Sequence, residues 1–112
     1  MGVPHLWLVL TDPDPKTTLI ITVMVVTERP HTDRTVVLEP GDHSFIRHRS
    51  SIDYGSARYV PISKMSGILR NSAANLQPDM TPKLLARVRQ GLLASPRTIN
   101  AIADDCRKAF GK

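Results

Sequence analysis

The sequence predicts an α+β fold in which a small β-barrel, or a strongly curved antiparallel sheet, is followed by two C-terminal helices. Several short segments rich in β-branched residues follow one another before residue 65, with turns containing Pro and Gly between them. Closely spaced short strands of this kind are typical of small barrels and curved sheets. After residue 80, two segments begin with a Thr-Pro or Ser-Pro pair and carry apolar residues at helical spacing, which predicts two helices.

The predicted strands are apolar runs between turn signals. His5–Leu10 is a short apolar run that ends in a Pro-rich turn, and it is too short for a helix. Thr17–Thr27 is rich in β-branched residues and apolar on both faces, which predicts a central strand. We expect these two segments to pair as a hairpin. Shorter strands are predicted at Thr35–Leu38, Ser44–Ile46 and Ser56–Ile62.

The two helices are predicted from their start signals and from their apolar stripes. Thr81-Pro82 combines a capping side chain with the residue that suits the first helical position. Ser95-Pro96 repeats this signal and predicts the start of a second helix, while residues 63–78 are predicted to be mostly loop. The stripes are Leu84, Leu85, Val88 and Leu92 in the first helix, and Ile99, Ile102, Ala103, Cys106 and Phe110 in the second.

Length and composition suit one domain, residues 1–112, with a barrel part at about 5–65 and a helical part at about 81–112. The net charge of +5 suits a polyanionic partner such as RNA, although the same charge also serves solubility. The single cysteine, Cys106, excludes an internal disulfide, and we expect it to be a packing residue in a cytoplasmic protein. No apolar run is long enough to span a membrane, and no signal-peptide pattern opens the chain.

The segment Leu38–Tyr54 holds the densest group of residues that could carry chemistry. Two histidines, His43 and His48, can move protons near neutral pH. The adjacent Arg47 and Arg49 can hold a phosphate. This combination suits the cleavage or binding of a phosphodiester, for which one group accepts a proton, another donates one and a cation stabilises the developing charge. The alternative interpretation is a solvated loop of a basic protein, in which each histidine bonds to a backbone group.

A second basic patch lies upstream and consists of Arg29, His31 and Arg34. If Thr17–Thr27 and Thr35–Leu38 are neighbouring strands, the loop between them would lie near the first patch. The two patches would then form one positive groove that binds phosphates without reading their sequence.

Other interpretations of these residues find less support. His43 and His48 could bind a metal with Asp53, His5 or His31 as a third ligand, but the spacing matches no recognised ligand pattern. Ser50 and Ser51 lack a nucleophile-elbow motif, so a serine hydrolase is not indicated. Among the few aromatic residues, Tyr54 is the candidate for stacking on a base, whereas Trp7 and Tyr59 are expected in the core.

The pattern of strands resembles that of the PemK/MazF-like toxins. LWLVLTDP at Leu6–Pro13 is similar to the family's early strand and turn, and LIITVMVVT at Leu19–Thr27 to its central strand, which ends in an active-site threonine. TVVLEPGDHS at Thr35–Ser44 looks like the strand and turn that follow. SSIDYGSARYVPISKM at Ser50–Met65 looks like the polar turn that leads into the last barrel strands.

The resemblance implies an SH3-like barrel, an endoribonuclease that needs no metal or cofactor, an acidic antitoxin protein as partner, and a homodimer. Carried over by position, Thr27 and Asp53 would be site residues. His5 stands where the family has a phosphate-stabilising arginine, so another arginine would have to take that role.

The sequence therefore leads to two hypotheses. The first is a toxin-type endoribonuclease that cleaves RNA by attack of the 2′-hydroxyl, and the second is a non-catalytic module that uses the same barrel to bind nucleic acid or protein. The predicted catalytic residues are Thr27, His43, Arg47, His48 and Asp53. The predicted RNA contacts are His5, Arg29, His31, Arg34, Arg49 and Tyr54.

Overall fold

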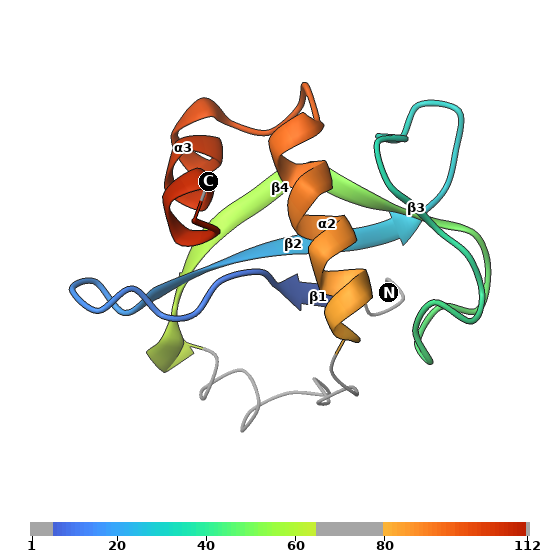
Figure 1. Ribbon diagram of the computed structural model, residues 1–112. Helices are drawn as coiled ribbons and strands as arrows, with labels where there is room; N and C mark the ends of the chain where they lie inside the picture. Colours follow the sequence, from blue (N-terminus) through green and yellow to red (C-terminus); the bar gives the residue numbers. More distant parts are fainter. Residues whose placement is uncertain (1–5, 65–79, 112) are drawn as a thin grey trace.

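The computed structural model describes residues 6–64 and 80–111, and it confirms a curled antiparallel sheet followed by two helices. The strands are arranged in the order β1-β2-β4-β3, and helices α2 and α3 lie together on one face of the sheet (Figure 1). The bounds are β1 Leu6–Val9, β2 Leu19–Thr27, β3 Val37–Leu38, β4 Ser50–Pro61, α2 Pro82–Ala94 and α3 Asn100–Ala109. None of the helices in the described ranges is long and apolar enough to cross a bilayer.

The predicted hairpin of β1 and β2 is confirmed, with Leu6 opposite Val25 and Val9 opposite Thr22. The connection between the strands is closed by Asp14. Its carboxylate accepts hydrogen bonds from the backbone N–H groups of Lys16 and Thr17 at 2.8 and 3.0 Å. Aspartate is favoured in turns because it can satisfy nearby amides in this way.

The second half of the sheet differs from the prediction. β4 begins at Ser50 rather than Ser56. β3 pairs with β4, so the condition set for a single positive groove, that Thr17–Thr27 and Thr35–Leu38 are neighbouring strands, is not met. The register shifts between Thr22 and Met24, and the hydroxyl of Ser56 accepts a hydrogen bond from the Met24 N–H at 3.1 Å there. This bulge interrupts the alternation of side chains along β4, and the predicted strand covers only the part of β4 from Ser56 onward.

The short strand predicted at Ser44–Ile46 is absent, because the backbone turns at this point. The Ile46 N–H donates to the carbonyl oxygen of His43 at 2.9 Å. The predicted loop at residues 63–78 lies, from residue 65 onward, outside the described residues.

The start of α2 is confirmed, whereas α3 starts later than predicted. The hydroxyl of Thr81 accepts a hydrogen bond from the Leu84 N–H at 3.1 Å, and Pro82 opens α2. Ser95 ends α2 instead of opening α3, which begins at Asn100. The hydroxyl of Ser95 donates to the distant carboxylate of Asp33 and accepts from the N–H of Arg97, so the segment after Ser95 forms a turn and α3 begins only at Asn100.

The strands and both helices share one apolar core with Tyr54 at its centre. Tyr54 has no exposed surface, and its hydroxyl donates to the carbonyl oxygen of Val88 in α2 at 2.7 Å. Burial raises the pKa of Tyr54 well above its ordinary value. The predicted stacking of Tyr54 on an RNA base is therefore wrong, because its ring cannot be reached from solvent.

Two aromatic residues that were expected in the core are exposed instead. Trp7 is 37% exposed and Tyr59 is 39% exposed. Trp7 lies on the face of β1 opposite to the core residues Leu6 and Leu8, because side chains alternate along a strand. Cys106 is fully buried as predicted, and burial raises the pKa of its thiol to about 11.

Thr22 offers a direct test of the packing of β2. Its side chain is 2% exposed, and its hydroxyl has no hydrogen-bond partner in the part of the chain that the structure describes. Replacing Thr22 with valine exchanges this buried hydroxyl for a methyl group of the same shape. We expect the free energy of unfolding to rise by about 1 kcal/mol, measured by urea denaturation. A decrease would show that the hydroxyl has a partner after all.

Candidate functional site

The candidate site is built around the last residue of β2, Thr27. The Oγ1 of Thr27 lies 3.0 Å from the Nε2 of His48, so the two side chains are hydrogen-bonded. His48 precedes β4, and Thr27 pairs with Ser50 at the start of that strand. The pairing of β2 with β4 thus brings together two of the residues predicted to be catalytic.

A cavity of about 230 Å³ opens beside Thr27, and we call it the Thr27 cavity. It unites four of the predicted site residues, which come from β2, from the loop after it and from β4. It also contains three residues of that loop and of the α2–α3 turn that were not predicted. Its lining is Val26, Thr27, Arg29, His31, Thr32, Asp33, Asp53 and Arg97.

Arg97 is one of the cavity residues that sequence reasoning missed. It lies in the turn between α2 and α3, far along the chain from β2, and its Nη2 donates to the carbonyl oxygen of His31 at 2.9 Å. The backbone N–H of Arg97 donates to the hydroxyl of Ser95 at 3.1 Å. No local pattern distinguishes this arginine from the others, because its position depends on how the helices pack on the sheet.

Asp33 connects the loop after β2 to the α2–α3 turn. Its side chain is 5% exposed and accepts hydrogen bonds from the Ser95 hydroxyl at 2.5 Å and from the Thr35 hydroxyl and N–H at 2.6 and 2.9 Å. Burial by itself would raise the pKa of Asp33, but these hydrogen bonds and the charge of Arg97 outweigh it and lower the pKa. The carboxylate is therefore charged and holds the two segments that carry His31 and Arg97.

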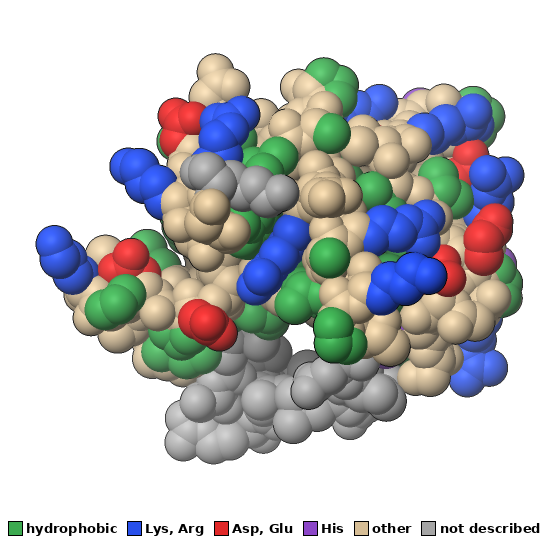
Figure 2. Space-filling view, in the orientation of Figure 1, with side chains coloured by type: hydrophobic (Ala, Val, Ile, Leu, Met, Phe, Trp, Pro, Cys, Tyr) green, Lys and Arg blue, Asp and Glu red, His purple; other side chains and the backbone are tan. Residues whose placement is uncertain are grey.

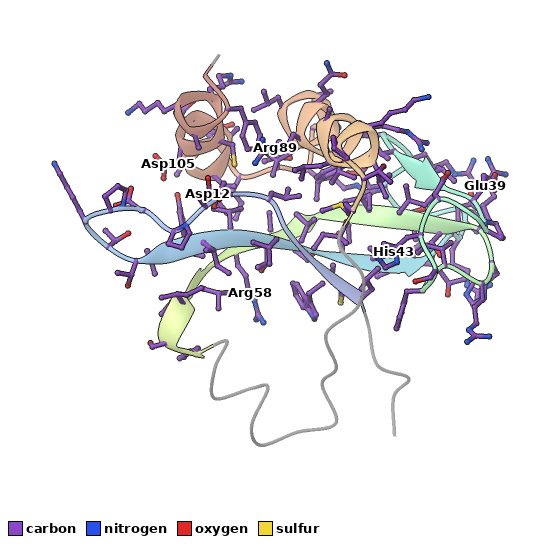
Figure 3. All side chains as sticks on the ribbon, turned by 60° about the horizontal axis from the view of Figure 1, so that its bottom comes forward. Asp12, Glu39, His43, Arg58, Arg89 and Asp105 are labelled. Carbon is purple, nitrogen blue, oxygen red and sulfur yellow. The ribbon has the colours of Figure 1, made fainter. Side chains whose placement is uncertain are left out.

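His43 has a structural environment. It is 8% exposed, lies in the loop between β3 and β4 (Figure 3), and its Nδ1 accepts a hydrogen bond from the Phe45 N–H at 3.0 Å. It does not line the Thr27 cavity. This arrangement favours the structural alternative for His43. The second histidine near the site is His31, which is exposed and lines the cavity.

The remaining predicted residues are distributed around the site. Arg34 forms an ion pair with Glu28 at 3.0 Å, and Arg49 forms one with Glu39 at 3.5 Å. Arg47 is exposed in the loop before β4, and His5 lies outside the described residues. Figure 2 shows Lys and Arg side chains, with a few acidic ones among them, over the end of the molecule that carries β3.

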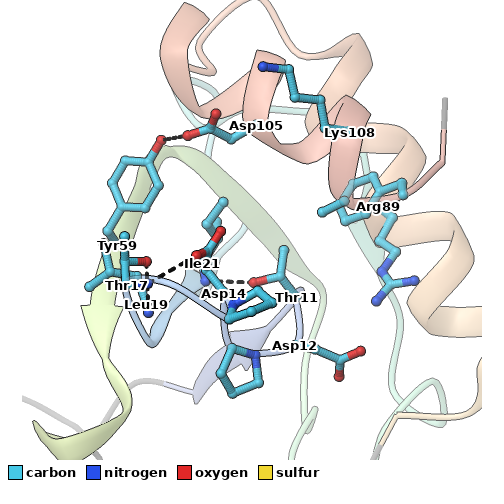
Figure 4. Close-up of a pocket in the computed structure, with 14 residues that line it drawn as sticks. Thr11, Asp12, Asp14, Thr17, Leu19, Ile21, Tyr59, Arg89, Asp105 and Lys108 are labelled. Carbon is cyan, nitrogen blue, oxygen red and sulfur yellow. Dashed lines mark hydrogen bonds between the residues drawn. The ribbon is translucent and has the colours of Figure 1, made fainter.

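A larger cavity, of about 680 Å³, lies between the β1–β2 connection and α3 (Figure 4). Several of its polar groups already have partners. The hydroxyl of Tyr59 donates to the carboxylate of Asp105, which raises the pKa of Tyr59 to about 12. The Nε of Arg89 donates to the carbonyl oxygen of Leu10, and its guanidinium carbon lies 4.8 Å from the ring centroid of Phe110. None of the predicted site residues lines this cavity, so we place the candidate site at Thr27.

Comparison of the chain with protein-family profiles, with curated proteins and with solved structures gives no match. Within residues 6–64 and 80–111, no three His, Cys, Asp or Glu side chains form a group that could hold a metal ion.

Proposed function

We propose that this protein is a toxin-type endoribonuclease that cleaves RNA by attack of the 2′-hydroxyl, without a metal ion. The observation that carries the proposal is the hydrogen bond between Thr27 and His48 beside a cavity lined by two arginines and a second histidine. These are the groups that 2′-hydroxyl attack requires: two proton carriers and cations for the phosphorane. The pattern of strands, which is similar to that of the PemK/MazF-like toxins, also supports it.

In the proposed reaction, the phosphate of an RNA strand occupies the Thr27 cavity. One histidine of the pair His31 and His48 removes the proton from the 2′-hydroxyl, whose oxygen attacks the phosphorus. The other histidine gives a proton to the departing 5′-oxygen. The products are a 2′,3′-cyclic phosphate and a 5′-hydroxyl, so atoms and charges balance without a further reactant.

The other residues of the cavity bind and orient. Arg29 and Arg97 provide cations for the charge that develops on the phosphorane oxygens. Thr27 holds the ring of His48 in position through its hydroxyl. Asp53 faces the same cavity and is suited to accept a hydrogen bond from a ribose hydroxyl.

The proposal extends to partners and location. The charge of +5 suits RNA and also an acidic antitoxin that competes for the same arginines. A homodimer follows from the resemblance to the toxin family, and a cytoplasmic location from the single cysteine of the chain.

A second candidate is a non-catalytic module that binds RNA at the same cavity. This candidate is favoured by the environment of His43, because His43 is buried and hydrogen-bonded to the backbone. A nuclease would therefore depend on His31 as its second proton carrier. The two candidates differ in one observable, the appearance of cleaved ends.

The test is incubation of the purified protein with a long RNA in the presence of EDTA, followed by mapping of the ends. We expect discrete cuts that carry 2′,3′-cyclic phosphates. Replacing His48 with alanine should lower the cleavage rate by about 100-fold or more, and replacing Arg97 with alanine should do the same.

The matched control is Arg107→Ala, which removes an arginine of α3 that is paired with Asp104 at 2.7 Å. It should leave the cleavage rate unchanged. Cleavage that persists in the His48 variant would contradict the assigned role, and RNA binding without cleavage in the wild type would establish the second candidate.

A further inference from the structure

The outer face of the sheet connects the Thr27 cavity to an exposed tryptophan. In the strand register, Asp53 of β4 lies opposite Met24 of β2, and Met24 lies opposite Trp7 of β1. Side chains that are opposite one another across strands share a face of the sheet. Because neighbouring strands are about 4.8 Å apart, Trp7 lies about 10 Å from Asp53 along this row. Asp53, Met24 and Trp7 therefore form one row across the sheet, from the cavity to the edge strand β1.

Trp7 is held in place by Arg58. The guanidinium carbon of Arg58 lies 4.5 Å from the centroid of the indole ring. Arg58 comes from β4, pairs with Thr22 and lies on the same outer face, which Figure 3 turns toward the reader. Such a contact fixes the orientation of the ring, and 37% of the Trp7 surface is still open to solvent.

The chemistry of this pair matches a nucleotide. An exposed indole offers a stacking surface for any base, and an arginine beside it can contact the phosphate of the same strand. If a second copy of the chain covered this face instead, the Arg58 side chains of the two copies would lie near each other. Repulsion between these like charges disfavours that arrangement.

We propose that Trp7 and Arg58 form a base-stacking subsite for single-stranded RNA whose neighbouring phosphate occupies the Thr27 cavity. This inference rests on the proposed function and adds the position of a second nucleotide. Trp7 holds the base, and Arg58 orients the indole and contacts the backbone of the strand.

The test uses Trp7 as its own reporter, because it is the only tryptophan of the chain. A 2′-O-methyl RNA hexamer, which cannot be cleaved, is titrated into the full-length protein while the tryptophan emission is recorded. We expect saturable quenching by the hexamer and none by inorganic phosphate at the same concentration. The affinity is measured in parallel by the anisotropy of a labelled hexamer.

The variants separate stacking from charge. Trp7→Ala should weaken hexamer binding by about tenfold, and Arg58→Lys, which retains the charge without the planar group, should weaken it less. The matched control is Val9→Ala, which changes an exposed apolar residue of the same strand and face. It should alter the affinity less than twofold, and circular dichroism should show that all three variants are folded.

The outcomes for the subsite and for the nuclease are distinguishable. Binding of the hexamer without quenching, with Trp7→Ala binding as the wild type does, overturns the subsite and leaves the nuclease standing. Quenching and the tenfold loss support the subsite even where the wild type cleaves nothing. A Trp7→Ala variant that turns a dimer into a monomer, with unchanged hexamer affinity, overturns the subsite and assigns the face to a second copy. No binding of the hexamer to the wild type overturns both proposals.

Discussion

Replacing Gly91 with alanine is expected to lower the free energy of unfolding by about 2 kcal/mol, although alanine is the better helix former. A Cβ atom at this position would lie 2.8 Å from the Cζ of Tyr54 and 2.5 Å from the Cγ2 of Val36. Both distances are shorter than real Cβ contacts allow, so the aromatic ring or the helix must move. Overpacking of this kind costs about 1–3 kcal/mol, while the gain in helix propensity returns about 1 kcal/mol at most.

Urea denaturation of Gly91→Ala and of the double variant Gly91→Ala/Tyr54→Phe checks this explanation. The double variant lacks the Tyr54 hydroxyl that the new methyl group would meet. The two substitutions together should therefore lower the free energy of unfolding by less than the sum of their separate effects. The matched control is Gly55→Ala in β4, where the nearest atom would be 3.5 Å away and little change is expected. A Gly91 variant as stable as the wild type would mean that α2 and Tyr54 do not approach so closely.

Replacing Asp33 with alanine is the second substitution with a large expected effect. The carboxylate is 5% exposed and accepts three hydrogen bonds, from the Ser95 hydroxyl and from the side chain and backbone of Thr35. Its removal leaves the buried Ser95 hydroxyl without this partner and takes away one of the links between the α2–α3 turn and the loop after β2. We expect a loss of about 3 kcal/mol in the free energy of unfolding. Under the proposed function, RNA binding should also weaken, because Arg97 and His31 lie on the two segments that Asp33 connects.

The pH dependence of the free energy of unfolding tests whether the negative charge of Asp33 is the cause of this stabilisation. The pKa of Asp33 in the folded protein lies below the ordinary value of 3.8, so in acid the unfolded chain binds more protons than the folded one. The contribution of the charged Asp33 carboxylate to the free energy of unfolding is therefore complete above about pH 5. It is lost as the pH falls through the pKa that Asp33 has in the folded protein. The difference in stability between the wild type and Asp33→Asn should accordingly be largest at neutral pH and shrink below pH 4.

A matched control for this series is Asp104→Ala, which removes an exposed carboxylate of α3 that forms an ion pair with Arg107. Exposed pairs contribute about 0–1 kcal/mol, so this variant should unfold close to the wild type at every pH. An Asp33 variant that behaves in the same way would contradict the connecting role of Asp33.

Local signals were sufficient to predict the fold class and several elements. Thr81-Pro82 predicts the start of α2 because a cap and a first-turn proline act within four residues, and the structure confirms it. The hairpin of β1 and β2 follows from two apolar runs around a Pro-rich turn. Thr27, Asp53, Arg29 and His31 were predicted as residues of one site, and they line one cavity. The pairing of Thr17–Thr27 with Thr35–Leu38, on which the single positive groove was conditional, is not formed, because β3 pairs with β4.

The remaining features depend on contacts between distant segments, which no local pattern contains. Whether Tyr54 or Trp7 points into the core depends on which face of the sheet the helices cover. The bulge in β4 sets the register between β4 and β2. Asp33 and Arg97 enter the site only because the α2–α3 turn packs on the loop after β2. The sequence by itself therefore determined the fold class, the β1–β2 hairpin and the start of α2, because these depend on local signals. Tertiary packing decided the extent of β4, which side chains are buried and which arginine reaches the cavity.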